Sequence, residues 1–217
     1  MITFKFISTT DIERAFLWQK KFAQTNSYVF PRTIEDYRQF AEDQWLWGAV
    51  DEGGDYLGFV YYVMDSDTWE IGGLMVSEQA RGCGIGSTLM RIALANTLLY
   101  EDPLLQGKRV IAHVHEENDM PRPIIENALR FKIARQIEVD GQNLPGLKTN
   151  DHGKVIGTEY ELSIQESLNA LADWCFRWNG FLKNEKQAEI ELLEGVSLDD
   201  WASDLKQMRK KYSKNKS

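Results

Sequence analysis

The fold is decided by the segment Leu74-Met75-Val76-Ser77-Glu78-Gln79-Ala80-Arg81-Gly82-Cys83-Gly84-Ile85-Gly86-Ser87. Three apolar residues end a strand, a short polar turn follows, and alternating glycines lead into an apolar helical pattern. Such a loop bends tightly, and a phosphate can approach its backbone N–H groups because no Cβ stands in the way. The helix behind it adds unpaired N–H groups and the positive end of its dipole. The segment therefore predicts a diphosphate-binding loop with Arg81 as a full charge at its mouth.

Several classes of phosphate-binding loop share this outline. A P-loop needs lysine after the turn, and this chain has Gly86-Ser87-Thr88 instead. A dinucleotide-binding loop of the Rossmann kind needs glycine at position 87, where serine stands. The stretch Gly82-Cys83-Gly84-Ile85-Gly86 is closer to the loop of S-adenosylmethionine-dependent methyltransferases, but Ala80 stands where those loops usually carry an acid. The methyltransferase hypothesis is thus weaker and stays open.

Alternation and helical spacing of apolar residues predict the elements on both sides of this loop. Strands are expected over about 2–6, 45–50, 56–64, 68–77, 109–115, 134–139 and 155–164. Helices are expected from about 12 to 22, from Pro31 to about 41, from about 87 to 98, and from Pro121 to about Phe131. The order β-α-α-β-β-β-α-β-α-β-β indicates an α/β (α+β) fold with a mixed sheet rather than a regular βαβ series.

The last fifty or so residues follow a different pattern. One helix is marked by Trp174 and Trp178, which are expected to pack against the main sheet, and a second helix begins at Ser197-Leu198-Asp199-Asp200. The lysine- and arginine-rich end is expected to fray. We therefore divide the chain into a domain at 1–164 and a helical C-terminal extension with a basic tail at 165–217.

Composition excludes several function classes. The 217 residues carry a net charge of −8, which disfavours a nucleic-acid binder with a broad basic face. Cys83 and Cys175 lie far apart in the sequence and outside any metal-ligand spacing, so neither a disulfide framework nor a metal site is expected. No window approaches the roughly 18 uninterrupted apolar residues of a membrane span, and the start lacks the pattern of a secretory signal. A soluble cytoplasmic protein without a membrane partner is expected.

The loop, the strand before it and the turn between them resemble the acetyl-CoA-binding segment of the GNAT N-acetyltransferases. In that family an apolar strand and a short polar turn precede Arg/Gln-x-x-Gly-x-Gly/Ala, matched here by Arg81, Gly84 and Gly86, and Val114 and Asn118 match a later strand followed by asparagine. The resemblance covers about 1–164 and implies the GNAT acyl-CoA N-acyltransferase fold with acetyl-CoA (CoA) as cofactor. It also implies a bulge at Gly72-Gly73 that splays the fourth and fifth strands apart. The implied cofactor-binding residues are the strand backbone at Leu74, Met75 and Val76, the loop residues Arg81, Gly82, Cys83, Gly84, Ile85, Gly86 and Ser87, and Asn118.

Acetyl transfer to an amine sets chemical requirements. An alkylamine with a pKa of about 10 must lose a proton before it attacks, and the developing oxyanion needs a donor such as the N–H of Met75 or Val76. Glu70, four residues before Leu74, stands where some members of the family place a catalytic glutamate. His113 and His115 alternate on the fifth strand, and His115, nearer the strand end, is the second candidate for the base.

One departure from the family pattern affects the mechanism. Many members carry a tyrosine seven residues after the asparagine as general acid, and Ile125 stands there. A catalytically degenerate, CoA-binding or interaction module therefore remains an alternative to an enzyme that acetylates a primary amine through a ternary complex. By analogy, residues 27–37 and 140–154 would wall the acceptor site. Neither the acceptor, a small molecule or a protein, nor the oligomeric state follows from the sequence.

Overall fold

The computed structural model describes residues 1–214, with the side chains at 184 and 214 excepted, and contains one eight-stranded mixed sheet. The strand order is β6-β7-β5-β4-β3-β2-β1-β8. The pairs β1–β8 and β4–β5 are parallel, and the other neighbouring pairs are antiparallel. The strands are β1 (Ile2–Phe6), β2 (Leu46–Asp51), β3 (Tyr56–Met64), β4 (Thr68–Val76), β5 (Arg109–His115), β6 (Phe131–Asp140), β7 (Lys154–Leu162) and β8 (Ala188–Ile190).

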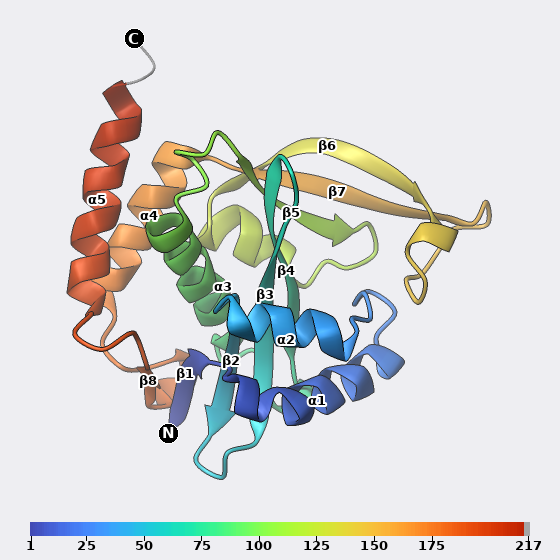
Figure 1. Cartoon of the computed structure of the whole chain (residues 1–217), viewed down its shortest axis with the longest axis horizontal. Helices are drawn as coiled ribbons and strands as arrows, with labels where there is room; N and C mark the ends of the chain where they lie inside the picture. Colours follow the sequence, from blue (N-terminus) through green and yellow to red (C-terminus); the bar gives the residue numbers. More distant parts are fainter. Residues whose placement is uncertain (215–217) are drawn as a thin grey trace.

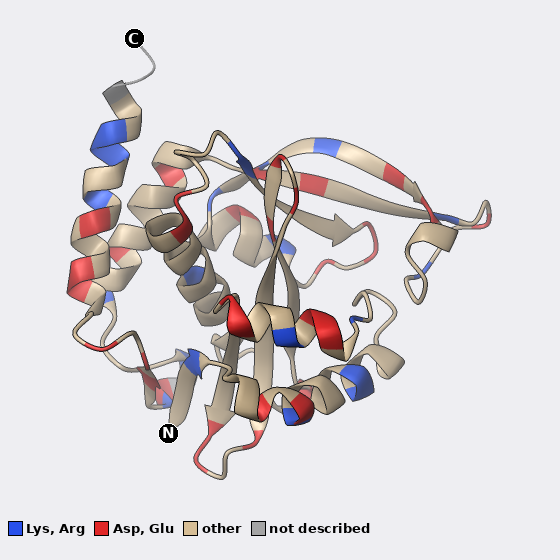
Figure 2. Cartoon of the chain, in the orientation of Figure 1, with Lys and Arg blue, Asp and Glu red and all other residues tan. Residues whose placement is uncertain are grey.

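Helices cover both faces of this sheet (Figure 1). They are α1 (Ile12–Thr25), α2 (Ile34–Glu42), α3 (Ile85–Asn96), α4 (Ile164–Arg177) and α5 (Leu198–Lys214). Alternate residues of β3 separate the two cores, because side chains along a strand point to opposite faces. Phe59 and Tyr61 belong to the core that includes α1 and α2, whereas Val60 and Tyr62 belong to the core that includes α3, α4 and α5. Charged residues lie mainly on the helices and loops, and the central strands are almost free of them (Figure 2).

The feature that positions the functional site is the separation of β4 from β5. Their parallel pairing is confined to Thr68–Glu70 on β4 and Arg109–Ile111 on β5. Just beyond it, the β3–β4 register shifts between Phe59 and Tyr61, and Gly73 takes a positive φ of 59°. Such a bulge bends its strand. The bulge expected at Gly72-Gly73 is therefore present, and β4 and β5 diverge beyond it.

The C-terminal residues pack on the main sheet. β8 extends the sheet beside β1, an element that the sequence pattern did not predict. The Trp178 ring lies edge-on against Phe4 at 6.4 Å between centroids, and Trp201 is 2% exposed with its indole N–H donating to Tyr100 Oη at 3.1 Å. α4 and α5 lie side by side (Figure 1). The division of the chain at residue 164 stays a prediction.

Three sequence expectations need correction. The helix expected from Pro121 to Phe131 is present but shorter, and most of it is the π-helix Ile124–Ala128, because the backbone at Arg130 turns to a φ of 62° and β6 begins at the next residue. α2 begins at a capping box between Thr33 and Asp36 and not at Pro31. The basic tail does not fray before residue 214: α5 reaches Lys214, and Tyr212 Oη donates to Asp102 at 3.0 Å. Residues 215–217, the end of that tail, lie outside the described residues.

Candidate active site

A cavity of about 310 Å³ opens at the glycine loop and is the candidate diphosphate site. Its lining includes Arg81, Gly82, Gly84, Ile85, Gly86 and Ser87, together with Leu74 and Val76 from β4 and Asn118 from the loop after β5. Arg81 Nε donates to Val76 O at 3.4 Å, which holds its charge against the end of β4. Met75 and Cys83 do not line this cavity: both are buried, at 0% and 7% exposed. The predicted loop residues and the strand residues before them thus meet at one place.

The start of α3 supplies the donors for this site. Gly84 precedes the helix with a φ of 95°, a conformation that glycine adopts without strain. The N–H groups of the first helical turn have no intrahelical partner and carry the positive end of the dipole. Ile85, Gly86 and Ser87 are in that turn. This cradle fits a phosphate group, because it combines free donors with open space.

Lys183, which sequence reasoning missed, also lines the cradle. It lies in the segment after α4, and a Cβ built on Gly84 would be 3.6 Å from Lys183 Cγ. Nothing in the local sequence around Lys183 indicates a ligand, because only the packing of residues 165–214 on the sheet brings it there. The C-terminal residues are therefore part of the site.

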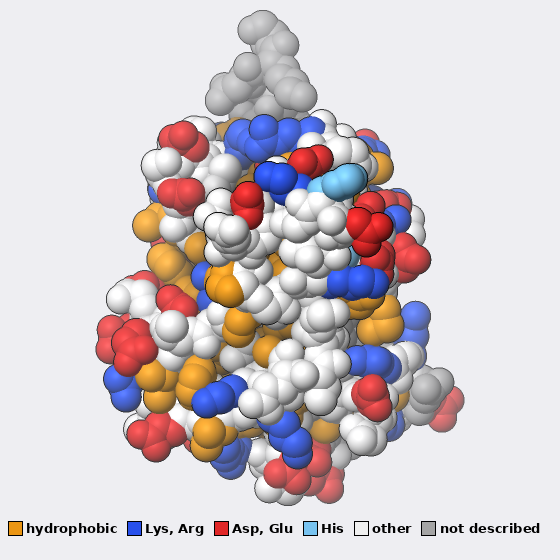
Figure 3. All heavy atoms as spheres, turned by 90° about the vertical axis from the view of Figure 1, so that its right-hand side faces the viewer, with side chains coloured by type: hydrophobic (Ala, Val, Ile, Leu, Met, Phe, Trp, Pro, Cys, Tyr) orange, Lys and Arg blue, Asp and Glu red, His pale blue; other side chains and the backbone are white. Residues whose placement is uncertain are grey.

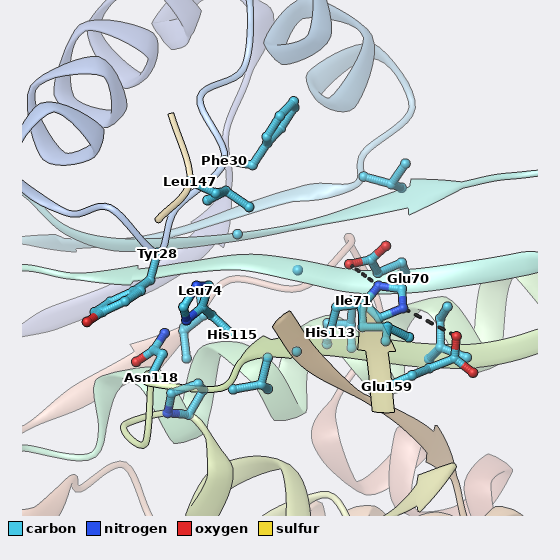
Figure 4. A pocket seen from close by; sticks show the side chains of 18 of the residues that line it. Tyr28, Phe30, Glu70, Ile71, Leu74, His113, His115, Asn118, Leu147 and Glu159 are labelled. Atoms are coloured by element: carbon cyan, nitrogen blue, oxygen red, sulfur yellow. Dashed lines mark hydrogen bonds and ion pairs between the residues drawn. The ribbon is translucent and has the colours of Figure 1, made fainter. Parts of the chain in front are cut away.

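A second cavity of about 680 Å³ continues from the first between β4 and β5. Leu74 and Asn118 line both cavities, and Gly72 and Gly73 line the second. The cavity runs from there to Glu70 and His113 (Figure 4). The two cavities thus adjoin, and together they reach from the glycine loop to the candidate catalytic residues.

At the far end of this space, His113 bridges two carboxylates. Its Nδ1 lies 3.1 Å from Glu70 Oε1, and its Nε2 lies 3.3 Å from Glu159 Oε2 (Figure 4). The Glu70 and His113 side chains are 33% and 32% exposed, so both reach the cavity, whereas Glu159 is 2% exposed. Burial lowers the pKa of His113, but the hydrogen bonds and charges of Glu70 and Glu159 outweigh it and raise that pKa above its ordinary value.

Glu159 is held ionised by the cations around it. Arg109 Nη2 donates to its Oε1 at 2.6 Å, and Arg135 Nη2 donates to its Oε2 at 2.9 Å. Burial raises the pKa of the Glu159 carboxyl, but these hydrogen bonds and the one from His113 together lower it to about 2. A permanently charged carboxylate therefore fixes one ring nitrogen of His113 and leaves the other facing Glu70. Within residues 1–214, no group of three or more His, Cys, Asp or Glu side chains is arranged to hold a metal ion.

His115 lines the cavity but both of its ring nitrogens are engaged. Its Nε2 donates to Lys148 O at 2.9 Å, and Nδ1 accepts from the Glu117 N–H at 3.2 Å. Its ring also packs against Tyr28 at 5.0 Å between centroids. This arrangement leaves no free lone pair for a base, so the geometry favours His113 over His115.

Two loops contact each other and close one side of the larger cavity. Lys148 N–H donates to Ser27 O at 2.9 Å, which joins the β6–β7 loop to the α1–α2 loop. A Cβ built on Gly146 would be 3.1 Å from Pro31, a second contact between the same loops. On the face of the molecule shown in Figure 3, side chains of both charges are mixed with apolar ones. The segments predicted to wall the acceptor site do line the cavity through Tyr28, Phe30, Arg32, Leu144 and Leu147.

Substitution Glu159→Gln is expected to destabilise the protein at neutral pH and much less in acid. The carboxyl pKa falls from 4.5 to about 2 on folding, so its contribution is present above pH 4.5 and is lost as the pH falls towards 2. That contribution is at most about 3 kcal/mol. Urea unfolding would measure the free energy of unfolding of wild type and variant at pH 7 and pH 3. The difference between the two proteins should be smaller at pH 3. Glu166→Gln, which removes an exposed partner of Lys132, is the control and should change the free energy of unfolding little. If Glu159→Gln lowered the free energy of unfolding equally at both pH values, the lowered pKa assigned to Glu159 would be contradicted.

The mixed sheet, the bulged β4 that diverges from β5, and the glycine loop at a helix start are features of the GNAT acyltransferase fold. Residues 13–120 match the family described as acetyltransferase (GNAT) family. The chain belongs to the GNAT superfamily.

Solved structures of acetyltransferases share this fold. The ribosomal-protein-S18-alanine N-acetyltransferase of Escherichia coli is 15% identical with a TM-score of 0.52, and the match covers 75% of this chain and 93% of that one. Salmonella typhimurium yncA with its cofactor acetyl-CoA is 15% identical with a TM-score of 0.55 and the same coverages. Arabidopsis thaliana NAA60 in complex with a bisubstrate analogue is 18% identical with a TM-score of 0.54, covering 75% and 98%. At these identities the likeness shows the fold, and no curated protein sequence matches the chain. Within residues 1–214, no helix is both long and apolar enough to cross a bilayer.

Proposed function

We propose that this protein transfers an acetyl group from acetyl-CoA to a primary amine by direct attack of the amine. The observation that carries the proposal is the pair of adjoining cavities, one at the glycine loop and one that lies between β4 and β5 and reaches Glu70 and His113. When bound, acetyl-CoA supplies an activated acetyl thioester. Membership of the GNAT superfamily supports acyl transfer in general, and the acceptor and the roles below are inferred from the site.

Different groups of this chain would bind different parts of acetyl-CoA. The N–H groups at the start of α3 would hold the diphosphate, and Asn118 would contact the pantetheine arm. Ser77 N–H donates to Leu57 O on β3, and backbone groups alternate along a strand, so the N–H of Val76 is directed to the open side of β4. There Val76 would pair with the arm and offer a donor to the carbonyl oxygen as negative charge develops on it.

Glu70 and His113 would together take the proton from the amine. Glu159 fixes the His113 Nε2 proton, which leaves Nδ1 and the Glu70 carboxylate to share the proton on the cavity side. The pair must be in its deprotonated form to act as a base, so the rate should rise with pH through the raised pKa of His113. Glu159 would be a positioning residue, because it orients the His113 ring in the way that a third group orients the base in other active sites.

The second candidate is a CoA-binding module without catalysis, and Ile125 is the observation that favours it. Ile125 is 2% exposed and lines the larger cavity, so an apolar side chain stands where a general acid would be expected. In the enzyme reading, the thiolate leaves without a proton from this position.

Ligand-dependent melting separates these candidates. A ligand that binds only the native state raises the melting temperature. We expect stabilisation by acetyl-CoA and CoA but not by S-adenosylmethionine, with CoA release when a panel of amines is added. Stabilisation by S-adenosylmethionine alone would contradict the proposal and revive the methyltransferase hypothesis. Stabilisation by CoA without turnover of any amine would favour the binding module.

Substitution Lys183→Gln is expected to weaken CoA binding about two- to fivefold, the scale of one exposed ionic contact. The cause would be loss of a positive charge over the diphosphate cradle. Titration of CoA by calorimetry at low and high salt should show a difference that shrinks as salt rises. Lys186→Gln, an exposed lysine on the same segment, is the matched control. Equal affinities for Lys183→Gln and wild type at low salt would remove Lys183 from the site.

A further inference from the structure

Arg32 presents an uncompensated positive charge to the acceptor end of the larger cavity. It lies in the α1–α2 loop, and its guanidinium is 4.9 Å from the centre of the Phe30 ring and 5.4 Å from that of Tyr61. Its Nε donates to Tyr61 Oη at 3.3 Å. No carboxylate among the described residues lies within ion-pair distance of it. The two terminal nitrogens therefore carry donors that no described group accepts.

The other arginines of this cavity are neutralised by the protein itself. Arg109 contacts both Glu159 and Glu161 at 2.6 Å, and Arg135 contacts Glu159 at 2.9 Å. Asp36, in the helix after Arg32, accepts from the Thr33 N–H at 2.8 Å and is committed to the cap of α2. Arginine cannot shed its charge near neutral pH, and its planar fork matches a carboxylate. An aromatic-packed arginine without a partner in a cavity thus indicates an anionic group on the ligand.

The position of Arg32 places that anionic group close to the reacting centre. The ring of Tyr61, whose hydroxyl accepts the hydrogen bond from Arg32, lies directly against the bulge, since a Cβ on Gly73 would be 1.9 Å from Tyr61 Cε1. Glu70 lies three residues before Gly73 on the same strand, and its charge also acts on the Tyr61 hydroxyl. An acceptor whose amine faces Glu70 and whose anionic group contacts Arg32 must therefore be short.

The walls of the cavity define the rest of the acceptor. Apolar side chains line it on the β6–β7 side, at Ile137, Val139, Leu144, Leu147 and Val155. The contact between Lys148 N–H and Ser27 O closes the cavity over. We propose that the acceptor is a small amino carboxylate with an apolar substituent, such as an α-amino acid, whose carboxylate is bound by Arg32. This inference rests on the proposed acetyl transfer and deepens it by naming the class of acceptor.

Matched acids and amides test this proposal directly. Leucine, methionine and phenylalanine would each be compared with the corresponding amide, which keeps the amine and the side chain but lacks the negative charge. We expect kcat/KM to favour the acid about 10- to 100-fold in at least one pair, the scale of a charge-assisted hydrogen bond. In Arg32→Gln that preference should fall to near one, while acetyl-CoA raises the melting temperature as it does for wild type. Because the preference is a ratio within one variant, it is independent of how much of that variant is active.

The control is Arg38→Gln, an exposed arginine of α2 whose partner is Glu35; it should keep the preference for the acid. Three results would overturn the proposal: amides used as well as acids in every pair, a preference for acids that survives Arg32→Gln, or turnover of neither member of any pair by a protein that acetylates other amines of the panel. Failure of wild type to bind acetyl-CoA, or to acetylate any amine at all, would instead overturn the proposed function, so the two failures are distinguishable.

Discussion

Gly73→Ala is expected to lower the free energy of unfolding by about 2–4 kcal/mol and to abolish most acyl transfer. Gly73 has a φ of 59°, where an L-residue is strained by roughly 1 kcal/mol or more. A Cβ there would also lie 1.9, 2.2 and 2.6 Å from three atoms of the Tyr61 ring. Tyr61 is 2% exposed and stacked on Phe40 at 4.8 Å between centroids, so it cannot move away freely. Overpacking of this kind costs about 1–3 kcal/mol.

The functional loss follows from the bulge. A β4 that relaxed to regular geometry would move its backbone relative to β5, whose pairing with β4 now stops at Ile111. Misplacement of a reacting group by about 1 Å can cost on the order of 100-fold in rate. Denaturant unfolding and turnover with a saturating amine would measure the two effects separately.

Gly54→Ala is the matched control for this variant. Gly54 lies between β2 and β3 with a φ of 81°, but nothing lies within 4 Å of the Cβ it would gain. It should therefore show only the backbone cost of about 1 kcal/mol and full activity. If Gly73→Ala behaved like Gly54→Ala, the contact of Tyr61 with the bulge would have no importance for stability or function.

Glu70→Gln is expected to reduce kcat about 100- to 1000-fold with little change in CoA affinity, since a positioned general base contributes on this scale. Glu70 Oε1 lies 3.1 Å from His113 Nδ1 in the wall of the larger cavity, whereas the cradle proposed to hold CoA lines the smaller cavity. The pH dependence makes the assignment specific. Removing the carboxylate removes contributions that raise the His113 pKa. The rise of rate with pH should therefore shift to lower pH in the variant, while the plateau falls.

Glu138→Gln, an exposed strand glutamate on β6 outside both cavities, is the control for this experiment. It should leave the rate and its pH profile unchanged. A Glu70→Gln protein with normal kcat and a normal pH profile would exclude the Glu70–His113 pair as the base.

The sequence pattern predicted the strand-loop-helix segment around Leu74–Ser87 because its signals are local. Alternation marks the strand, glycines permit a φ of 95° at Gly84, and helical spacing marks α3. The bulge was also predictable, since two adjacent glycines inside a strand weaken its pairing. The packing of the Tyr61 ring against Gly73 was not predictable, because contacts between strands depend on a register that no local pattern specifies.

Choosing between the two histidines needed the tertiary structure. His113 and His115 share a face of β5, and their order on the strand favoured His115. Their difference arises from partners far away in the chain: Glu159 on β7 for His113, and Lys148 in the β6–β7 loop for His115. The register of β5 with β7, in which His113 pairs with Glu159, decides which histidine meets a carboxylate.

By itself the sequence determined the class of fold, the position of the glycine loop that we propose binds a diphosphate, and the candidate glutamate, because each depends on residues close together in the chain. Only the tertiary structure decided which histidine joins Glu70, that Lys183 lies over the cradle, and that Arg32 stands in the acceptor cavity without a carboxylate among the described residues. These groups are brought together by strand register and by the packing of residues 165–214 on the sheet. Both arise from burial of apolar surface over the whole chain, which is non-directional and leaves no local signature at the residues it brings into contact.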